Sequence, residues 1–385
     1  MRIAAFFVST AIAAKIIIPR VYPIVFFLTL QRIRVKLVAP VFHFESDYLE
    51  GCCPQILEAL QATNLEQTPG YGEDPHCAKA ADMIRFVFDC PDADVHFLVG
   101  GTQTNATVIA SLLRPHQGVL CAASAHINVH ETGAVEHCGH KILSLPASDG
   151  KISAAQVREA LEAHQRDFSR EHMVQPGMVY ISFPTELGTI YTKQELTDLH
   201  AVCTEWEIPL FIDGARLGYG LEASGCNVLP KDLPRLCDVF YIGGTKQGAL
   251  FGEAVVFTDT RLSEDFRYCI KQNGGMLAKG RLLGIQYEVL MNKGLYFQLA
   301  RKADRLADRI RAAFARKGVP FLVENTTNQV FPILETGTVE RFAAAFGFEP
   351  WRAVDDKHVA IRFCTSWATP DSAIDELEAY IEKNI

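Results

Sequence analysis

The sequence predicts an α/β protein, built on a mostly parallel sheet covered by helices and followed by a small α+β C-terminal domain. Apolar runs of strand length alternate with segments of helical spacing across about residues 90–260, which is the pattern of a parallel sheet. After this region the pattern is mainly helical, and residues 321–385 mix short strands with helices. We expect an N-terminal extension over residues 1–40, an arm and large domain over 41–295, and a small domain over 296–385.

Composition and charge describe an ordinary globular protein. The chain has 385 residues, of which 49% are hydrophobic and 21% charged, enough for one large domain and a smaller one. Its formal net charge of -8 opposes a nucleic-acid-binding surface. The 11 cysteines are scattered without a Cys-x-x-Cys pair, which indicates reduced thiols rather than a disulfide framework or a zinc ribbon. We therefore expect a cytoplasmic protein that acts on a small molecule.

The N-terminal extension is strongly apolar over residues 3–30, but Lys15, Pro19, Arg20 and Pro23 interrupt it. No uninterrupted run reaches the ~20 residues that a membrane-spanning helix needs. Three interpretations stay open: a poor signal anchor, a surface helix, or a stretch translated from a start codon too far upstream. Membrane contact through residues 1–40 is the lesser alternative, because two prolines and two cations oppose a spanning helix.

The individual elements follow from apolar spacing and from turn residues. Pro54 begins the first amphipathic helix, at the first turn where proline is favoured. Further helices are predicted over Cys77–Phe88, Ala106–Leu113, Ser153–His164, Glu195–Trp206, Leu262–Gln272, Lys279–Met291, Tyr296–Lys317, Val339–Phe346 and Asp371–Lys383. Strands are predicted over Val95–Val99, Val119–Ala122, Lys141–Leu145, Met178–Phe183, Leu210–Ile212, Val239–Ile242, Phe321–Val323, Gln329–Ile333 and Val359–Phe363.

A glycine turn, Gly100-Gly101, joins the first of these strands to a helix. Such a junction leaves several backbone N–H groups unpaired and directed at one place, which makes a ready anion site. The hydroxyls of Thr102 and Thr104 add two donors. The turn is not a P-loop, because no lysine follows the glycines. The alternative is a plain tight turn into a helix.

Four histidines lie close together in the sequence: His126, His130, His137 and His140. They raise the alternative of a metal-dependent hydrolase, but the H-E-x-x-H pattern fails because Thr132-Gly133-Ala134 follows Glu131. A single functional histidine is favoured over a metal site, so we predict no metal. His126 is the best placed of the four, because it stands where a strand gives way to a helix.

Two strand ends carry the polar residues around which the prediction of function is built. The apolar run Leu210–Ile212 ends in Asp213, and Val239–Ile242 is followed by Gly243-Gly244-Thr245-Lys246. Ligands of open α/β sheets bind at this carboxyl edge. An acid and a lysine delivered there indicate a cofactor with a basic ring nitrogen and an aldehyde, which is pyridoxal 5'-phosphate. Taken singly, the lysine could be a solvated loop residue and the aspartate a turn former.

A pyridoxal-phosphate enzyme must bind, orient and tune its cofactor. We expect Lys246 to form the Schiff base with the cofactor aldehyde and Asp213 to keep the ring nitrogen protonated. Gly101 and Thr102 would bind the phosphate, and His126 would cover the ring. Arg362 lies between two apolar strand residues, where an arginine is costly to bury unless a carboxylate pairs with it. We therefore expect Arg362 to bind the carboxylate of an amino-acid substrate.

The stretch Asp213-Gly214-Ala215-Arg216-Leu217 resembles the D-G-A-R-L signature of the threonine aldolase and β-eliminating lyase family. Other stretches that resemble family motifs, in the family's order, are Tyr71-Gly72-Glu73-Asp74, Gly101-Thr102 with Asn105, Ala125-His126-Ile127 with Glu131, and Arg362-Phe363 with Thr365-Ser366-Trp367. The resemblance covers about residues 44–385. It implies fold type I of the pyridoxal-phosphate enzymes, with a seven-stranded type of sheet.

The resemblance also implies residue roles. Arg216 would bond the phenolic oxygen of the cofactor, and Ser46 would hold the substrate carboxylate together with Arg362. The enzyme would be a homodimer or homotetramer whose active sites are completed across a subunit interface. Two stretches depart from the family. Leu277 stands in Asn273–Leu277 where the family has an arginine, and Lys279 or Arg281 are candidates to replace it. The surroundings of the lysine, Thr245-Lys246-Gln247-Gly248-Ala249, also differ from the usual Ser-Lys-Gly of the aldolases.

The predicted reaction is cleavage of the Cα–Cβ bond of a β-hydroxy-α-amino acid. Threonine or allo-threonine would give glycine and acetaldehyde, with His126 or a water that it positions as the base. The first alternative keeps the cofactor but eliminates the β-substituent, which releases pyruvate and ammonia. The metal-dependent hydrolase and a non-enzymatic binding module are more remote alternatives.

Overall fold

The computed structural model describes residues 42–385. The predicted extension over residues 1–40, and with it the question of membrane contact, lies outside the described residues. Within the described part, no helix has the length and apolar character needed to cross a membrane.

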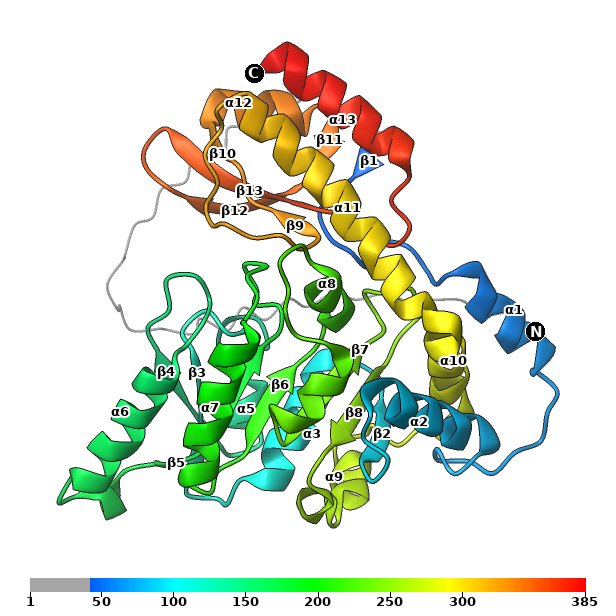
Figure 1. Ribbon diagram of the computed structural model, residues 1–385, viewed down its shortest axis with the longest axis vertical. Helices are drawn as coiled ribbons and strands as arrows, with labels where there is room; N and C mark the ends of the chain where they lie inside the picture. Colours follow the sequence, from blue (N-terminus) through cyan, green and yellow to red (C-terminus); the bar gives the residue numbers. More distant parts are fainter. Residues whose placement is uncertain (1–41) are drawn as a thin grey trace, which may run out of the picture. The chain divides into compact units, whose positions relative to one another are not determined.

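A seven-stranded sheet lies at the centre of the large domain (Figure 1). In spatial order its strands are β2 (Asp94–Leu98), β8 (Glu253–Phe257), β7 (Val239–Gly243), β6 (Leu210–Asp213), β5 (Gln175–Ser182), β3 (Gln117–Ala122) and β4 (Lys141–Leu145). The five strands β7, β6, β5, β3 and β4 pair in parallel in this spatial order. Strand β8 is antiparallel to both of its neighbours, β7 and β2. The predicted mostly parallel sheet is therefore confirmed.

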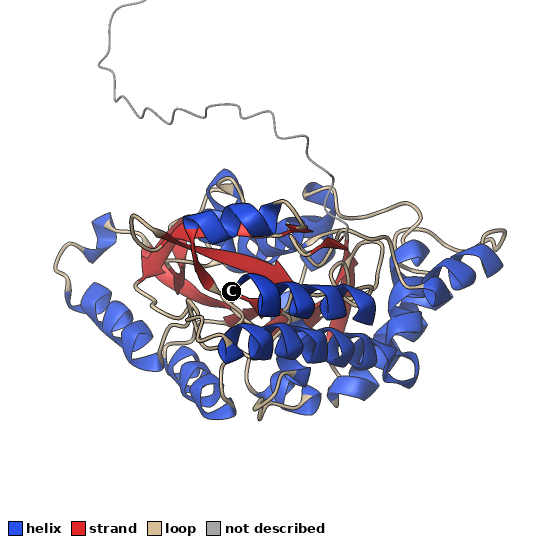
Figure 2. Cartoon of the chain, turned by 90° about the horizontal axis from the view of Figure 1, so that it is seen from above, coloured by secondary structure: helices blue, strands red, loops and turns tan. Residues whose placement is uncertain are grey.

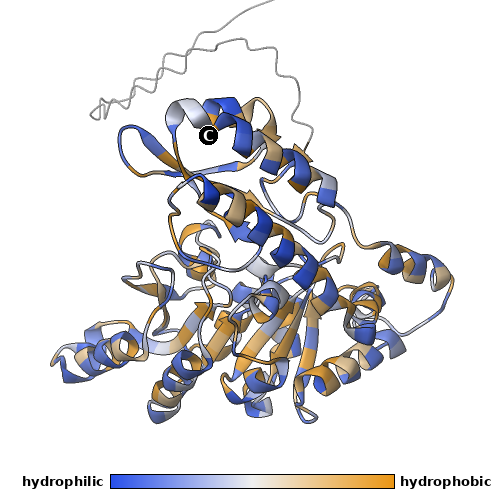
Figure 3. Ribbon diagram, turned by 45° about the horizontal axis from the view of Figure 1, so that its top comes forward, coloured by the Kyte–Doolittle hydropathy of each residue, from blue (hydrophilic) through white to orange (hydrophobic). Residues whose placement is uncertain are grey.

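Helices lie on both sides of this sheet (Figure 2). Within residues 42–294 they are α1 (Pro54–Ala62), α2 (Pro75–Phe88), α3 (Gly101–Leu112), α4 (His126–Val129), α5 (Ala134–His137), α6 (Ala154–Arg166), α7 (Lys193–Glu205), α8 (Leu217–Glu222), α9 (Phe266–Gln272) and α10 (Arg281–Met291). Short 3-10 helices span Arg170–His172, Pro230–Arg235, Thr260–Ser263 and Asn292–Gly294. The sheet strands are mainly apolar, whereas the helices alternate apolar and polar residues (Figure 3), as expected when one helix face packs on the sheet.

Local sequence signals begin several of these helices. Thr192 and Glu195 form a capping box at α7, as Ser153 and Gln156 do at α6. The helix predicted to begin at Ala106 begins earlier, at Gly101, so that part of the prediction is wrong. The glycine turn therefore becomes the first turn of α3, and its free N–H groups belong to a helix N-terminus.

The C-terminal part has its own core and small sheets. It contains α11 (Leu295–Arg316), α12 (Thr336–Ala343), α13 (Asp371–Asn384), β9 (Gln329–Val330), β10 (Ile333–Glu335), β11 (Phe346–Gly347), β12 (Glu349–Ala353) and β13 (His358–Cys364). Strand β1 (Phe42–His43) pairs with β11, and Phe44 packs in this second core.

Helix α11 joins the two parts of the fold (Figure 1). Its first turn packs on the core of the large sheet through Tyr296, and its later turns pack in the second core through Ile310 and Phe314. Helix α11 begins at Leu295 and contributes to both cores, so no interruption of the helix marks a domain boundary. The boundary predicted at 295/296 therefore stays a prediction.

The direction of the strands explains where the site forms. Strands β3, β5, β6 and β7 run in parallel and end at the same edge of the sheet, and antiparallel β8 begins there. Asp213 ends β6, Lys246 follows β7, and Glu253 begins β8. Residues far apart in the sequence are therefore brought to one edge.

Candidate active site

A cavity of about 690 Å³ lies at this edge of the sheet. Its size is within the range of small-molecule sites. The eight site residues predicted from sequence all line it: Ser46, Gly101, Thr102, His126, Asp213, Arg216, Lys246 and Arg362. The structure thus brings together residues that the sequence spreads over more than 300 positions.

Lys246 has a free amine in this cavity. Its backbone carbonyl accepts a hydrogen bond of 2.6 Å from Tyr219, which fixes the chain at this point. Among residues 42–385 no carboxylate lies within 4.0 Å of its Nζ. Burial and the positive charge of Arg216 lower the pKa of the Lys246 amine, against the opposing effect of nearby carboxylates. A lowered pKa increases the neutral, nucleophilic fraction of the amine.

Asp213 is a carboxylate fixed by donors on both oxygens. Tyr241 and the Ala215 backbone N–H donate to Oδ1 at 2.6 and 2.9 Å. Tyr180 and Asn105 donate to Oδ2 at 2.5 and 3.0 Å. Burial raises the pKa of Asp213, but the charge of His126 and these hydrogen bonds outweigh it and hold the pKa below its ordinary value. Asp213 is thus a fixed negative charge, and a further donor would join or replace one of these four.

His126 is held by a second buried carboxylate. Its Nδ1 lies 2.7 Å from Oε1 of Glu131, whose side chain is fully buried. Oε1 also accepts a hydrogen bond of 2.8 Å from Asn105, which bonds Asp213 as well. The chain His126–Glu131–Asn105–Asp213 therefore fixes the imidazole relative to the strand-end carboxylate.

The N-terminus of α3 lies at the cavity, where the sequence predicts an anion site. Gly101 and Thr102 are the first two residues of the helix, so their N–H groups have no partner within it. A Cβ at position 101 would come within 3.2 Å of the Tyr241 hydroxyl, which explains the glycine. The phosphate site at Gly101 and Thr102 stays a prediction, and a helix N-terminus is a favourable place for such an anion.

Arg216 is held in the cavity by a buried ion pair. Its Nε and Nη2 donate to the two carboxylate oxygens of Asp47 at 2.7 and 3.0 Å. Asn328 donates to Asp47 at 2.8 Å as well. Burial alone would raise the pKa of Asp47. The charges of Arg216 and Lys246 and these hydrogen bonds have the larger, opposite effect and lower the pKa to about 2. Arg216 is therefore presented to the cavity in a fixed orientation, and its Nη1 has no hydrogen-bond partner among residues 42–385.

Arg362 and Ser46 have polar atoms without partners. Arg362 donates to the Glu45 backbone carbonyl at 2.7 Å and to Gln329 at 3.3 Å, and its guanidinium lies 5.1 Å from the ring centre of Trp351. It makes no ion pair among the described residues. Its Nε and the Ser46 Oγ are buried without a hydrogen-bond partner. Since buried polar atoms normally have partners, these two atoms fit an anionic group of a ligand.

Four further carboxyl groups, which sequence reasoning missed, line the cavity: those of Glu45, Glu186, Glu253 and Glu349. Two of them, Glu253 and Glu186, adjoin strands of the large sheet. Glu253 accepts a hydrogen bond of 3.2 Å from Thr245, and burial raises the pKa of its carboxyl to about 8, against the effect of Lys246. Glu186 follows β5 and accepts a bond from the His126 backbone. Glu253 begins an apolar strand, and Glu186 lies shortly after another, in Pro184-Thr185-Glu186, so the available signal was an acid next to a buried strand.

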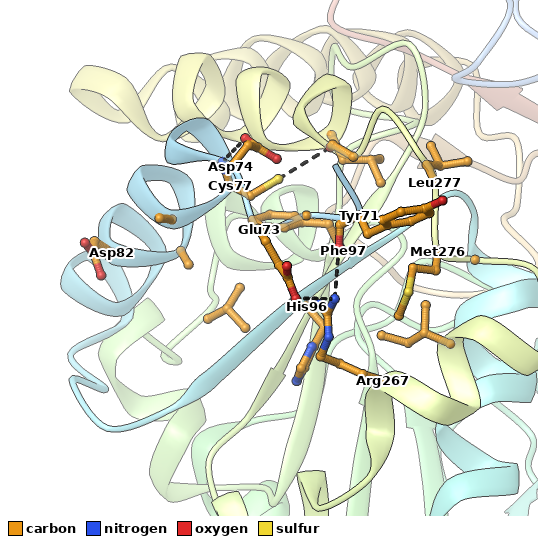
Figure 4. Close-up of a pocket in the computed structure, with 18 of the residues that line it drawn as sticks. Tyr71, Glu73, Asp74, Cys77, Asp82, His96, Phe97, Arg267, Met276 and Leu277 are labelled. Carbon is orange, nitrogen blue, oxygen red and sulfur yellow. Dashed lines mark hydrogen bonds and ion pairs between the residues drawn. The ribbon is translucent and has the colours of Figure 1, made fainter. Parts of the chain in front are cut away.

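A second cavity of about 300 Å³ is separate from this site (Figure 4). It brings together the two motifs Tyr71–Asp74 and Gly275–Leu277, and an Arg267–Glu73 ion pair of 3.1 Å crosses it. Neither motif lines the larger cavity within this chain. Arg281 donates to the backbone carbonyls at 63, 64 and 66, so the guanidinium is taken up in holding the end of α1. Lys279 is exposed.

The four histidines do not converge on one point. The rings of His126 and His130 lie 5.6 Å apart and both line the larger cavity. His140 is buried and bonds the backbone carbonyl of Gln117 at 3.2 Å, and His137 is exposed. Over residues 42–385 no group of three or more His, Cys, Asp or Glu side chains has the arrangement of a metal site. The histidine cluster therefore gives the hydrolase alternative no support.

Fold and cavity together define an α/β enzyme of the pyridoxal-phosphate class. The amine of Lys246, the ionised Asp213, the helix terminus at Gly101 and the unpaired guanidinium nitrogen of Arg362 all fit that cofactor and an amino-acid substrate. Residues 43–336 match the model of the beta-eliminating lyase family. The chain belongs to this family, whose cofactor is pyridoxal 5'-phosphate.

Known relatives cover most of the chain. It is 32% identical over 342 residues to a low specificity L-threonine aldolase of Pseudomonas sp., with 88% of this chain and 96% of the relative covered. A solved threonine aldolase of Leishmania major is 42% identical, with a TM-score of 0.86 over 89% of this chain and 99% of its own. An aspartate aminotransferase of Thermus thermophilus, 15% identical, has a TM-score of 0.64 over 90% and 91%. The last is a likeness of fold alone, and the fold is type I.

Proposed function

We propose that the protein is a carbon–carbon lyase that cleaves threonine or allo-threonine to glycine and acetaldehyde. The observation that carries the proposal is the convergence in one cavity of the Lys246 amine, an ionised Asp213 and the Arg362 Nε, which has no hydrogen-bond partner among residues 42–385. The two relatives named as threonine aldolases, at 32% and 42% identity, support this choice of reaction.

The cofactor would be held by the strand-end residues. Lys246 would bind its aldehyde, Asp213 its ring nitrogen, Arg216 its phenolic oxygen, and Gly101 with Thr102 its phosphate. When bound, pyridoxal 5'-phosphate supplies an acceptor for the electron pair left at Cα when the Cα–Cβ bond breaks. The part of Asp213 is to hold a negative charge at the ring nitrogen, since the hydrogen bonds at its two oxygens keep it ionised.

The substrate would be held by its carboxylate. Arg362 and Ser46 each have a buried polar atom without a partner, and a carboxylate can accept from both. The aromatic face of Trp351 orients the guanidinium. His126, fixed by Glu131, would cover the cofactor ring and is one candidate for the base that takes the β-hydroxyl proton.

The direct experiment is a product assay on the purified protein with the cofactor added. Incubation with threonine and with allo-threonine is expected to release acetaldehyde and glycine in equal amounts. Arg362→Met is expected to raise KM for both by ten- to a hundredfold, the effect of losing about 1.4 to 3 kcal/mol of a charged contact. Arg352→Met, an exposed arginine on neighbouring β12, is the matched control. If neither threonine nor allo-threonine released acetaldehyde, the proposal would be refuted.

β-Elimination is the second candidate, because the matching family model describes beta-eliminating lyases. It would use the same cofactor and carboxylate contacts but would release pyruvate and ammonia from serine-, cysteine- or aromatic-type amino acids. A pyruvate assay on that panel separates the two reactions. Pyruvate without acetaldehyde would favour elimination.

We also propose a homodimer or homotetramer in the cytoplasm. Several large apolar side chains are exposed on the described surface, among them Tyr48, Leu49, Leu57 and Leu250, with 40 to 55% of each accessible. Exposed apolar side chains mark a subunit interface where they form one contiguous patch. The 11 cysteines are unpaired thiols, which fits a reducing compartment. Light scattering after gel filtration tests the oligomeric state, and cell fractionation tests the location in the cytoplasm.

A further inference from the structure

Glu186 presents a carboxylate to the larger cavity from the loop after β5. Its Oε1 accepts hydrogen bonds from the His126 backbone N–H at 2.8 Å and from the Ser182 hydroxyl at 2.6 Å. Its Oε2 has no hydrogen-bond partner among residues 42–385. One oxygen therefore fixes the side chain and the other is left free in the site.

Two hydrogen bonds connect Glu186 to the residue proposed to bind the substrate carboxylate. Gln329 donates from Nε2 to the Glu186 backbone carbonyl at 3.5 Å, and its Oε1 accepts from Nη1 of Arg362 at 3.3 Å. Glu186 therefore stands between Arg362 on one side and His126 on the other. A β-hydroxy-α-amino acid held through its carboxylate at Arg362 would lie in this part of the cavity.

The surroundings of Glu186 increase its affinity for a proton. Burial and the negative charge of Asp213 raise the pKa of Glu186, against the lowering effect of the Ser182 hydrogen bond. The other titratable groups near it are Cys121 on β3, Tyr180 on β5, Tyr191 after β5 and His126 on α4. A carboxylate with a raised pKa is a better general base than an ordinary glutamate.

His126 is less suited to the same task. Its Nδ1 is taken up by Glu131 at 2.7 Å. A histidine that covers the cofactor presents the face of its ring, and its nitrogens then point along the cofactor plane. With Nδ1 occupied, a separate carboxylate beside the substrate is better placed than His126 to exchange the hydroxyl proton.

We propose that Glu186 is a catalytic residue that takes the proton of the substrate β-hydroxyl as the Cα–Cβ bond breaks. The inference rests on the proposed aldol cleavage. The O–H bond breaks and its proton goes to Oε2, while the freed electron pair forms the second C–O bond of the aldehyde. The electron pair of the Cα–Cβ bond stays with Cα, which then gains one proton to give glycine. The reaction as a whole neither consumes nor releases a proton.

The test compares Glu186→Gln with the unaltered holoenzyme. Glutamine keeps an oxygen that can accept from His126 and Ser182, so the loop stays anchored, but it cannot take up a proton. Glu222 on α8 forms an ion pair with Arg301 on α11, and Glu222→Gln, which removes this ion pair, is the control. Four quantities are measured: cofactor absorbance, glycine binding by spectral titration, exchange of the glycine α-proton for deuterium, and kcat for threonine cleavage across pH.

The expected result is a selective loss of cleavage. Glu186→Gln lowers kcat by 10² to 10⁴ while absorbance, glycine affinity and α-proton exchange stay within threefold, since none of these three involves a β-hydroxyl. The unaltered enzyme loses activity on the acid side with an apparent pKa above the usual range of glutamate, and this limb disappears in the variant. Cleavage within threefold of the unaltered enzyme would overturn the proposal, as would an equal loss of α-proton exchange. If the unaltered enzyme released no acetaldehyde, the proposed function itself would fail.

Discussion

Replacing Asp47 by asparagine tests the buried ion pair that fixes Arg216. Asp47 is completely buried and binds the guanidinium at two points, 2.7 and 3.0 Å. In Asp47→Asn the guanidinium keeps its charge but loses the carboxylate that neutralises it. The structure predicts a loss of both folding stability and cofactor affinity, because the same arginine lines the cofactor cavity.

The magnitude follows from two independent figures. Removing one partner of a buried ion pair costs about 3 to 5 kcal/mol. The pKa of Asp47 falls from 3.8 to about 2, and a difference of roughly two pH units corresponds to about 2 to 3 kcal/mol. This contribution is present above about pH 4 and is lost as the pH falls through 2, because the folded state then binds the proton that the unfolded state already holds.

Thermal unfolding of the cofactor-free protein at pH 7 measures the effect. With an unfolding entropy of about 2.1 cal/mol/K per residue over roughly 340 residues, a loss of 3 to 5 kcal/mol lowers Tm by about 4 to 7 °C. Asp89→Asn breaks an exposed pair with Arg235 and is the control, with an expected loss below about 1 kcal/mol.

A double-mutant cycle sharpens this test. Arg216→Met alone leaves Asp47 buried without its cation, and it should also destabilise the protein. The double variant removes both charges, so its loss should be smaller than the sum of the two single losses by about 2 kcal/mol or more. Simple additivity, or an Asp47→Asn shift no larger than that of the exposed control, would refute the reasoning.

Two further predictions concern a glycine and a histidine. Gly101→Ala places a Cβ 3.2 Å from the Tyr241 hydroxyl, so we expect roughly tenfold weaker cofactor binding by spectral titration, about 1.4 kcal/mol, with Gly337→Ala on α12 as the control. Burial lowers the pKa of His96 to about 4, so the folded state resists protonation and stability falls as the pH drops from 6.5 to 4. His96→Phe keeps the edge contact with Phe266 and should flatten that fall, which amounts to about 3 kcal/mol, in Tm measured against pH. An unchanged pH profile would contradict the second prediction.

The parts of the fold and site that are local in sequence could be predicted. Lys246 and Asp213 each follow a short apolar run, so their place at a strand end is visible in the sequence. Because parallel strands end at the same edge, their proximity follows without knowledge of the strand order. The beginning of α3 could not be predicted, since Gly100 and Gly101 resemble a turn in the sequence, whereas in the structure Gly100 is the N-cap and Gly101 the first helical residue.

The partners of these residues depend on pairing that the sequence does not display. Tyr180 and Tyr241 reach Asp213 only because β5 and β7 flank β6. Glu253 enters the cavity because β8 runs antiparallel, which places the start of this strand beside the ends of the others. Asp47 was the neighbour of a predicted site residue, but its contact with an arginine 169 positions away comes from the tertiary fold.

The most direct measurement for the central assignment is the location of the cofactor on the chain. Purified protein with pyridoxal 5'-phosphate should absorb in the near-visible range, and borohydride reduction followed by peptide mass spectrometry should place the cofactor on Lys246. Lys246→Ala should lose both the absorbance and the threonine cleavage, while Lys141→Ala, an exposed lysine on β4, keeps both. Cofactor found on another lysine, or full absorbance and cleavage in Lys246→Ala, would contradict the assignment.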